Sequence, residues 1–481
     1  MIFTIISAGI FSTFIGILIA SNNVSLLRPR WNVPVIRMAN ESFFIEAETS
    51  VPLLDASDFS ASITSIYGDF ELDIVNNNIQ VDGKSIKVEV GFPSNVVNDT
   101  LYDLDISVGG LSDNQSHAVK VVQEYHDEFK IIIWGDTQVG YSPDFSDEES
   151  ARAFEFVKEM VIQANLINPE FIFIVGDFTE VALHEEYEFM FEQCMRLQVP
   201  IYIGPGNHDY FNIQEYIRWC EYTYFSFDYG PDYHFNYVDT GMNLDALRDH
   251  VWDWLVSDIE AHSDFPVQIV AGHAPPYQCD GVDVTEVNRN FENHNAEFVE
   301  LLEERNVPAY FYGHNNKDKI TYANCTPVDM SSPLNQTWYV QVRSGRESAG
   351  YRVVEFKDKQ MVNTTILTNA ITGARHDNAS LSAFVSEETM IPSIEVYKND
   401  TSSVVNSISI NITNRFEQEY MNNVTIRVHI NGTDADCFSN STGYYGIVKE
   451  DSVVDVPNTI MVEMNFYLPN NDTINIEIWK V

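Results

Sequence analysis

The sequence has few basic residues for its length. Its 481 residues include 27 Lys and Arg against 71 Asp and Glu, which gives a formal net charge of −44. A field of this sign repels phosphate backbones and therefore disfavours general nucleic-acid binding. A small phosphorylated substrate remains compatible with the chain if a local site, most simply one that holds metal ions, reverses the sign.

Cysteine is also scarce, and the five cysteines are widely spaced. They are too few and too scattered for a zinc cluster or a disulfide framework, although one or two disulfides are allowed and the odd number leaves at least one thiol over. Hydrophobic residues, in contrast, make up 44% of the chain and aromatic residues 13%. This composition excludes a mostly disordered chain, and the length predicts two to four folding units.

The first part of the chain lacks charge. Residues 2–20 carry no charged side chain and are long enough to form a membrane-spanning helix. The segment is longer than the apolar h-region of a usual signal peptide and has no basic residues before it. Arg28 and Arg30 follow it, and by the positive-inside rule they would hold the rest of the chain in the cytoplasm. We assign residues 1–25 to a signal peptide or a membrane anchor.

Glycosylation sequons favour export. Fourteen Asn-x-Ser/Thr motifs occur, at Asn23, Asn40, Asn98, Asn114, Asn324, Asn335, Asn363, Asn378, Asn399, Asn411, Asn423, Asn431, Asn440 and Asn471. None lies between Asn114 and Asn324, and bulky glycans suit exposed β-domains better than a packed catalytic core. We therefore expect a glycoprotein at the cell surface or outside the cell, either secreted or anchored by its N-terminus. The alternative is that a strand composition rich in Asn and Thr produces sequons that are never modified.

The hydrophobic pattern divides the rest of the chain into three regions. Residues 36–124 and 385–481 consist of short stretches with period-two alternation, which predicts all-β, immunoglobulin-like sandwich domains. Residues 128–370 alternate apolar runs with amphipathic stretches, the α/β pattern. The flanking β-domains could contact carbohydrate or the cell surface, or could act as spacers.

Five apolar runs in the middle region each end in polar residues. The runs are residues 130–134, 171–175, 201–203, 267–271 and 309–312. In this order they lead into Gly135-Asp136-Thr137-Gln138, Gly176-Asp177-Phe178-Thr179-Glu180, Gly206-Asn207-His208-Asp209, Gly272-His273 and Gly313-His314-Asn315-Asn316. Because strand ends in α/β proteins meet at one edge of a sheet, we expect these side chains to converge.

Carboxylates, carboxamides and imidazoles together are oxygen and nitrogen donors suited to divalent metals. A shared Asp can hold two cations roughly 3.5–4 Å apart, the spacing of two-metal hydrolytic sites. Such a pair generates a hydroxide nucleophile and neutralises phosphoryl oxygens. One further acid is then needed to protonate the leaving oxygen, and a His oriented by a carboxylate suits that task.

The five motifs, in this order, resemble those of the calcineurin-like metallophosphoesterase superfamily, which includes purple acid phosphatases and many phosphodiesterases. The resemblance covers roughly residues 128–356, and residues 252–255 and 298–302 look like the helices that precede the fourth and fifth motifs. It implies an α+β fold in which a double-sheet β-sandwich of mixed strands is flanked by helices. It also implies a metal-dependent phosphoric ester hydrolase that cleaves phosphate mono- or diesters by attack of a metal-activated hydroxide.

Carried over by position, the resemblance implies two metal sites. Asp136 would bind the first metal, Asp177 would bridge the two, and Asn207, His273 and His314 would complete the second site. Gln138 and Asn316 stand where the family usually has His, so the first site would be oxygen-rich and weak. Such a site favours Mn²⁺, Mg²⁺ or Ca²⁺ over Fe³⁺ or Zn²⁺.

The same resemblance makes His208 the general acid, with Asp209 holding its ring. Glu180 is expected to be a supporting carboxylate that binds no metal, and structural roles are favoured for four further residues, His184, His234, Arg343 and Arg346. Two alternatives to an enzyme remain: a metal-binding pseudoenzyme that acts as a receptor, and a surface protein without metal. The substrate is not readable from the chain.

Overall fold

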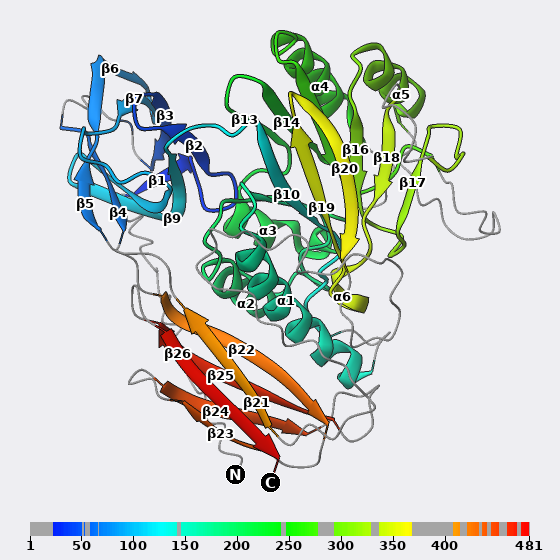
Figure 1. The fold of residues 1–481 in the computed structure, drawn as a ribbon. Helices are drawn as coiled ribbons and strands as arrows, with labels where there is room; N and C mark the ends of the chain where they lie inside the picture. The colour runs from blue at the N-terminus through cyan, green and yellow to red at the C-terminus, as the bar shows by residue number, and fades with distance from the viewer. Residues whose placement is uncertain are drawn as a thin grey trace, which may run out of the picture.

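The structure is a computed structural model. It describes residues 23–367, apart from 51, 53–57, 66, 142–145, 242–246, 278–292 and 329–335, together with six strands between residues 407 and 480. Figure 1 shows an N-terminal all-β part, a central part with helices and sheets, and a C-terminal group of strands. The predicted signal or anchor segment, residues 2–20, lies outside the described residues. Within the described part of the chain, no helix combines the length and apolar character needed to cross a membrane.

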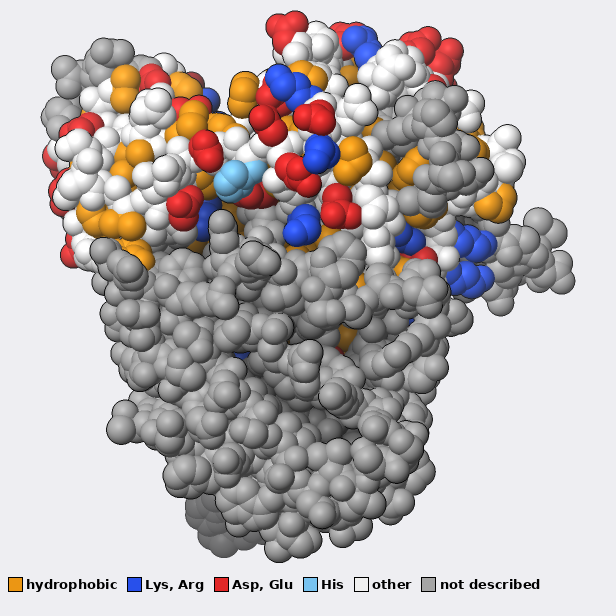
Figure 2. All heavy atoms as spheres, in the orientation of Figure 1, with side chains coloured by type: hydrophobic (Ala, Val, Ile, Leu, Met, Phe, Trp, Pro, Cys, Tyr) orange, Lys and Arg blue, Asp and Glu red, His pale blue; other side chains and the backbone are white. Residues whose placement is uncertain are grey.

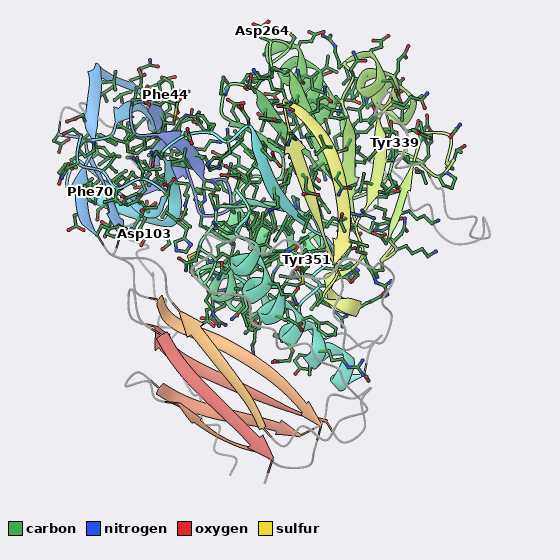
Figure 3. The ribbon with its side chains drawn as sticks, viewed as in Figure 1. Phe44, Phe70, Asp103, Asp264, Tyr339 and Tyr351 are labelled. Carbon is green, nitrogen blue, oxygen red and sulfur yellow. The ribbon has the colours of Figure 1, made fainter. Side chains whose placement is uncertain are left out.

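The N-terminal part consists of two sheets that enclose one hydrophobic core. Their strand orders are β1-β3-β7-β6 and β2-β9-β8-β4-β5. Strict alternation along β8 points Tyr102, Leu104 and Ile106 into the core. The ring of Phe70, labelled in Figure 3, packs edge-on against Tyr102. The strand bounds are β1 Val24–Arg28, β2 Val35–Met38, β3 Ser42–Thr49, β4 Ser60–Ser65, β5 Gly68–Glu71, β6 Asp73–Asp82, β7 Ser85–Gly91, β8 Thr100–Val108 and β9 Leu111–Val122.

This sandwich begins earlier in the chain than residue 36. The strand β1 pairs with β3 from Val24 onward, and its Leu26 side chain is completely buried. The predicted signal or anchor segment, residues 1–25, therefore overlaps the first strand by two residues. The physical reason is that β1 completes the sheet edge next to β3 and fills its core with Val24 and Leu26.

The central part contains two mixed sheets. The five-stranded sheet has the order β12-β11-β10-β19-β20 and the six-stranded sheet the order β13-β14-β15-β16-β18-β17. The strands β10, β11 and β12 are parallel, whereas β19 runs antiparallel to β10. The strand bounds are β10 Glu128–Trp134, β11 Ile172–Val175, β12 Ile201–Gly204, β13 Phe225–Tyr229, β14 Tyr233–Val238, β15 Val267–Gly272, β16 Ala309–Tyr312, β17 Lys319–Thr321, β18 Trp338–Gln341, β19 Tyr351–Lys357 and β20 Gln360–Leu367.

Helices cover the outer faces of both sheets, so the central part has four layers (Figure 1). One apolar cluster lies between the sheets, with Ile131, Phe173 and Phe235 among its buried members. A second cluster joins the five-stranded sheet to α1, α2 and α3, and a third joins the six-stranded sheet to α4 and α5. The helix bounds are α1 Asp147–Ile167, α2 His184–Cys194, η1 Asp209–Asn212 (a 3₁₀ turn), α3 Ile213–Cys220, α4 Asp249–Ala261, α5 Asn295–Glu304 and α6 Gly345–Ser348.

The predicted double-sheet architecture with flanking helices is confirmed. All five predicted apolar runs are strands, β10, β11, β12, β15 and β16, and four of them are buried along their whole length. Polar contacts fix the helices to the sheets as well. The hydroxyl of Tyr351 on β19, a residue labelled in Figure 3, donates a hydrogen bond of 2.6 Å to Gln163 Oε1 of α1.

The C-terminal strands form two three-stranded sheets of antiparallel strands, β21-β26-β23 and β22-β25-β24. Their bounds are β21 Ser407–Thr413, β22 Met421–Asn431, β23 Ala435–Ser439, β24 Tyr444–Asp451, β25 Thr459–Leu468 and β26 Thr473–Lys480.

The described cysteines are used in two ways. Cys194 and Cys220 are free thiols buried in the helical layer next to the five-stranded sheet. Cys325 is disulfide-bonded. The chain therefore contains a disulfide, as its cysteine content allowed, and disulfides persist mainly in oxidising compartments.

Candidate metal centre

The candidate ligands come from loops that follow β10, β11, β12, β15 and β16. Asp136, Asp177 and His273 each stand within two residues of the end of their strand. All three side chains are almost completely buried. The loops at the carboxyl ends of strands from both sheets therefore place their polar groups together, as the sequence predicts.

Four of these side chains surround one point. Asn207 Oδ1 lies 3.0 Å from His273 Nε2 and 2.9 Å from His314 Nδ1, and the two imidazole nitrogens lie 3.3 Å apart. Asp177 Oδ2 lies 3.2 Å from His273 Nε2. Ligand atoms about 2.1 Å from a common cation are separated from one another by about 3.0–3.4 Å. The four predicted ligands of the second site thus already have the spacing that a divalent cation requires.

The first predicted site offers oxygen atoms that lack protein partners. Gln138 Nε2 donates a hydrogen bond of 3.2 Å to Asp177 Oδ2. The other polar atom of this amide, Oε1, is buried. Among the described residues, no group donates a hydrogen bond to Gln138 Oε1 or to the buried Asn316 Oδ1. A buried carbonyl oxygen without a partner is costly, and a cation would satisfy it. Together with Asp136, these oxygens fit a hard cation better than a soft one.

The backbone at the centre adopts a conformation that is rare for side-chain-bearing residues. Asp136, Gln138, Asp177, His314 and Asn316 all have positive φ, between 41° and 72°. In the loop after β10, Asp136 and Gln138 have this left-handed conformation, and in the loop after β16, His314 and Asn316 have it. Non-glycine residues in this region are uncommon and cluster at functional sites.

Two glycines allow the loops to approach the carboxylates. A Cβ atom on Gly313 would collide with the Asp136 carboxylate, and one on Gly206 would collide with that of Asp177. The space that a methyl group would fill is thus occupied by the candidate ligands. Only glycine fits at both positions, because any other residue would bring a Cβ atom into contact with a carboxylate.

The electrostatics of the centre follow from burial and short distances. Burial, reinforced by the charge of Asp177, raises the pKa of Asp136 to about 7. Burial alone would raise the pKa of Asp177 as well, but His273 holds it well below its usual range. Burial alone would lower the pKa of His273, yet Asp177 raises it to about 9. Asp177 is therefore ionised and His273 protonated at neutral pH, and a cation that binds here would displace the proton from the His273 ring.

His208 stands beside the centre and has a partner other than the predicted one. Its Nδ1 lies 2.6 Å from the Glu180 carbonyl oxygen and 3.5 Å from Glu180 Oε2. Burial opposes protonation, but Asp177 and Glu180 raise the pKa of His208 above its ordinary value. The side chain is 24% exposed, so part of the ring reaches the surface beside the centre.

Glu180 is itself fixed by Arg346. The Arg346 guanidinium donates hydrogen bonds of 2.8 Å to Glu180 Oε2 and 2.7 Å to the Gln138 carbonyl oxygen, and both charged side chains are almost completely buried. Glu180 is thus the expected supporting carboxylate, and Arg346 has the structural role that the sequence favoured. One arginine connects the loop that bears Gln138 to the loop that orients His208.

The predicted contact between Asp209 and the His208 ring is wrong. The Asp209 carboxylate is completely buried and accepts five hydrogen bonds. Its donors are the backbone N–H groups of Phe178, Thr179 and Gly206 and the hydroxyls of Thr179 and Tyr187. Asp209 begins the 3₁₀ turn η1, and its side chain points towards the loop that contains Phe178 and Thr179. It therefore holds the second and third motifs together, and Glu180 takes the predicted place beside His208.

The two histidines expected to be structural lie away from the centre. His184 begins α2 on the surface, where Nδ1 lies 2.8 Å from Glu215. His234 of β14 is buried, with Nδ1 and Nε2 each 2.7 Å from a carboxylate oxygen, of Asp228 and Asp258 respectively. These carboxylates raise the pKa of His234 although burial opposes the shift. The pair with Asp258 attaches α4 to the six-stranded sheet, and the pair with Asp228 joins β14 to the neighbouring strand β13.

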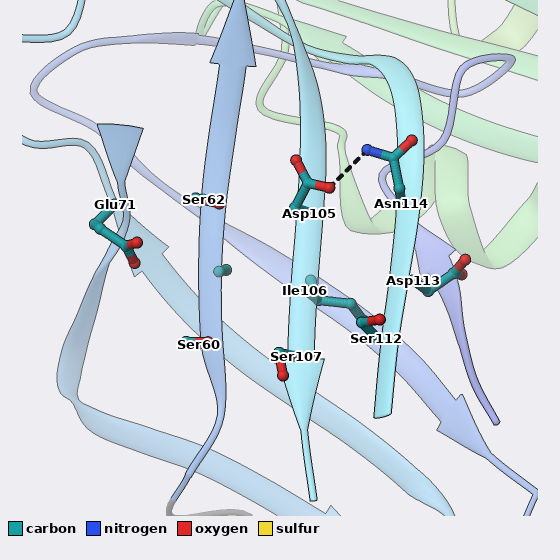
Figure 4. A pocket seen from close by; sticks show the side chains of 10 residues that line it. Ser60, Ser62, Glu71, Asp105, Ile106, Ser107, Ser112, Asp113 and Asn114 are labelled. Carbon is teal, nitrogen blue, oxygen red and sulfur yellow. Dashed lines mark hydrogen bonds between the residues drawn. The ribbon is translucent and has the colours of Figure 1, made fainter. Parts of the chain in front are cut away.

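The sequence did not indicate a cavity in the N-terminal part. It measures about 460 Å³ and lies on the outer face of the N-terminal sheet of β4, β5, β8 and β9 (Figure 4). Its lining is polar: Ser62, Asp105 and Asn114 lie in one row across three strands, and Asn114 donates a hydrogen bond to Asp105. None of the candidate metal ligands lines it. In the face shown in Figure 2, acidic side chains are spread over this part and the central part alike.

The comparisons with known proteins agree with this geometry. Residues 129–317 match the family model of calcineurin-like phosphoesterases, and this range contains every candidate ligand. No protein of curated function matches the chain in sequence.

Similar solved structures are distant. A purple acid phosphatase, PPD1, from yellow lupin (Lupinus luteus) seeds is 13% identical, with a TM-score of 0.44 over 72% of this chain and 74% of its own. GAP50, the anchor in the inner membrane complex of Plasmodium, is 13% identical, with a TM-score of 0.36 over 51% of this chain and 90% of its own. Phosphopantetheinyl hydrolase from Mycobacterium tuberculosis is 12% identical, with a TM-score of 0.30 over 46% and 92%.

These three likenesses are too remote to carry an argument about function. The assignment rests on the family model and on the five motifs, which converge at the carboxyl ends of the strands of a double-sheet core. The central part of this chain, over residues 129–317, is a domain of the calcineurin-like phosphoesterase family.

Proposed function

We propose that the protein is a metal-dependent phosphoesterase that hydrolyses phosphate mono- or diesters of small molecules. The observation that carries the proposal is the spacing of Asp177, Asn207, His273 and His314, whose ligand atoms surround one point. Divalent cations at this centre would supply a hydroxide nucleophile at neutral pH and neutralise phosphoryl charge. They would also reverse the local field of a chain with a net charge of −44.

The protein's own residues would divide the remaining tasks. Asp177 would bridge the two cation positions, with Asp136, Gln138 and Asn316 on one side. His208 would donate a proton to the leaving oxygen through Nε2, because Nδ1 is engaged by Glu180. The ion pair between Glu180 and Arg346 would keep the imidazole oriented during turnover.

The first site determines the metal requirement. Since Gln138 and Asn316 provide oxygen donors where imidazoles would favour softer metals, activity should depend on added Mn²⁺ or Mg²⁺ and disappear with a chelator. The double substitution Gln138→His with Asn316→His should tighten the first metal and shift the preference towards Zn²⁺. Hydrolysis of an aryl phosphate and of its diester, assayed with each metal in turn, tests both statements. A wild-type protein that keeps two equivalents of Zn²⁺ through dialysis would contradict this account of the site.

A second function rests on the same two amide side chains. A protein with a weak first site could bind one cation at Asp177, Asn207, His273 and His314 and serve as a receptor without turnover. The orientation of His208 by Glu180 favours the enzyme, because a receptor needs no proton donor. Metal binding without hydrolysis of any ester in the assay above would favour the receptor.

We also propose that the chain is exported and carries N-linked glycans. Five sequon asparagines have exposed side chains in the structure: Asn23, Asn40, Asn98, Asn114 and Asn324. The disulfide at Cys325 supports an oxidising compartment. Endoglycosidase treatment of protein from a eukaryotic secretory host should lower its mass and convert modified asparagines to aspartates. An unchanged mass would contradict the glycan proposal.

A further inference from the structure

Three large apolar side chains are exposed on segments that also carry residues of the centre. Tyr141, Leu183 and Phe211 are 59%, 51% and 55% exposed, and together we call them the apolar rim. Each stands three residues after a key residue of the centre, namely Gln138, Glu180 and His208. An exposed apolar side chain in contact with a residue of a polar site is a candidate contact for a ligand, because folding gains nothing from leaving it in water.

The first two members come from segments that pack against each other. Val139 and Thr179 form a parallel bridge, and the Glu180 N–H donates a hydrogen bond of 3.0 Å to the Val139 carbonyl oxygen. Gly140, the neighbour of Tyr141, lies so close to the Glu186 carboxylate that a Cβ atom would collide with it. The same carboxylate accepts a hydrogen bond of 3.1 Å from the Leu183 N–H.

The third member touches the proposed proton donor. The Phe211 ring packs edge-on against the His208 ring, with centroids 5.3 Å apart and planes at 83°. His208 in turn rests on Glu180, the residue that begins the segment leading to Leu183. The contacts thus connect the three rim residues to one side of the centre, the side of His208.

The proposed chemistry decides what this side must accommodate. The leaving oxygen has to reach His208 to receive its proton, so the group attached to that oxygen lies within a few ångströms of Phe211. Because the chain carries a net charge of −44, a leaving group with further negative charge would be disfavoured there. An apolar leaving group would instead gain contact area with aromatic and aliphatic side chains.

We propose that the apolar rim selects substrates whose leaving group is a bulky apolar alcohol or phenol. This inference rests on the proposed function and names the substrate class of the same centre. Phe211 is the principal specificity residue, and Leu183 and Tyr141 extend the surface that the leaving group contacts.

Binding of two non-hydrolysable phosphonates tests the inference without requiring turnover. Calorimetry on the full chain with Mn²⁺ should give at least about tenfold tighter binding for 2-naphthylphosphonate than for methylphosphonate. Phe211→Ala should remove most of this preference by weakening the binding of 2-naphthylphosphonate. The Mn²⁺ content of the variant, measured in parallel, reports whether the centre is intact. Phe44→Ala, at an exposed phenylalanine of the N-terminal sheet, is the matched control and should keep the preference.

The outcomes separate the inference from the proposed function. Equal binding of both phosphonates by the wild-type protein, or a preference that survives Phe211→Ala, would overturn the inference. Hydrolysis of phenyl and ethyl phosphate with no gain for 2-naphthyl phosphate would also overturn it, and the proposed function would stand. If the protein binds 2-naphthylphosphonate more tightly but hydrolyses no ester, the result would support the role of the apolar rim in binding. It would contradict the proposed phosphoesterase activity.

Discussion

Substitution of His273 by alanine should abolish tight binding of divalent metal and, with it, all phosphoesterase activity. His273 is completely buried, and its Nε2 atom lies within 3.3 Å of ligand atoms from Asp177, Asn207 and His314. An alanine leaves a gap at the point where these three groups converge. Loss of a group that only supports a ligand can lower metal affinity by about 10–100-fold, so loss of a ligand should exceed that range.

Metal analysis after reconstitution and dialysis, combined with a binding isotherm, measures this effect. His234→Gln provides the matched control, since His234 is equally buried on a strand of the same sheet but lies outside the centre. The control should retain metal even if the protein unfolds at a lower temperature. A reconstituted wild-type protein with less than about a tenth of an equivalent of metal would show that no functional centre forms.

Substitution of His208 by alanine should slow hydrolysis according to the leaving group. Proton transfer by a positioned side chain contributes about 10²–10⁴-fold, and the need for it grows with the basicity of the departing oxygen. We therefore expect a loss of that size with an alkyl phosphate and a distinctly smaller loss with a nitrophenyl phosphate. Metal content should not change, because His208 contacts Glu180 and leaves the ligand positions to other residues.

Two comparisons make the result for His208 specific. His184→Ala removes an exposed imidazole from the start of α2 and should leave both rates unchanged. Glu180→Gln preserves the shape of the side chain but weakens its pairing with Arg346, and it should cause a milder loss with the same dependence on the leaving group. Equal losses for both esters together with metal release would instead make His208 a ligand.

The sequence predicted the architecture of the central part because its signals are local. Apolar runs such as residues 172–175 are too short for helices and end in glycine, so the strands and their shared edge follow directly. The first strand escaped prediction because Val24 and Leu26 lie only a few residues after the uncharged segment of residues 2–20, and no charged residue separates the two.

The contacts of the centre were harder to predict because they join distant segments. The direction of the Asp209 carboxylate depends on the turn η1, which points it towards Phe178 and Thr179 and away from the neighbouring His208. Glu180 reaches His208 only because β11 and β12 lie side by side in the sheet. Residue types and their order therefore identified the ligands, whereas the partner of the proton donor required the fold.

The left-handed backbone of the centre bears on how this chain can change over generations. Each such residue costs of order 1–3 kcal/mol, and a domain has only about 5–15 kcal/mol of net stability. Glycine at Gln138 or His314 would relieve part of that cost in a chain with nothing to bind. Substitution of these residues by glycine would thus remove the site and make the protein more stable. The five left-handed residues therefore cost stability, and a cation bound by their side chains would offset that cost.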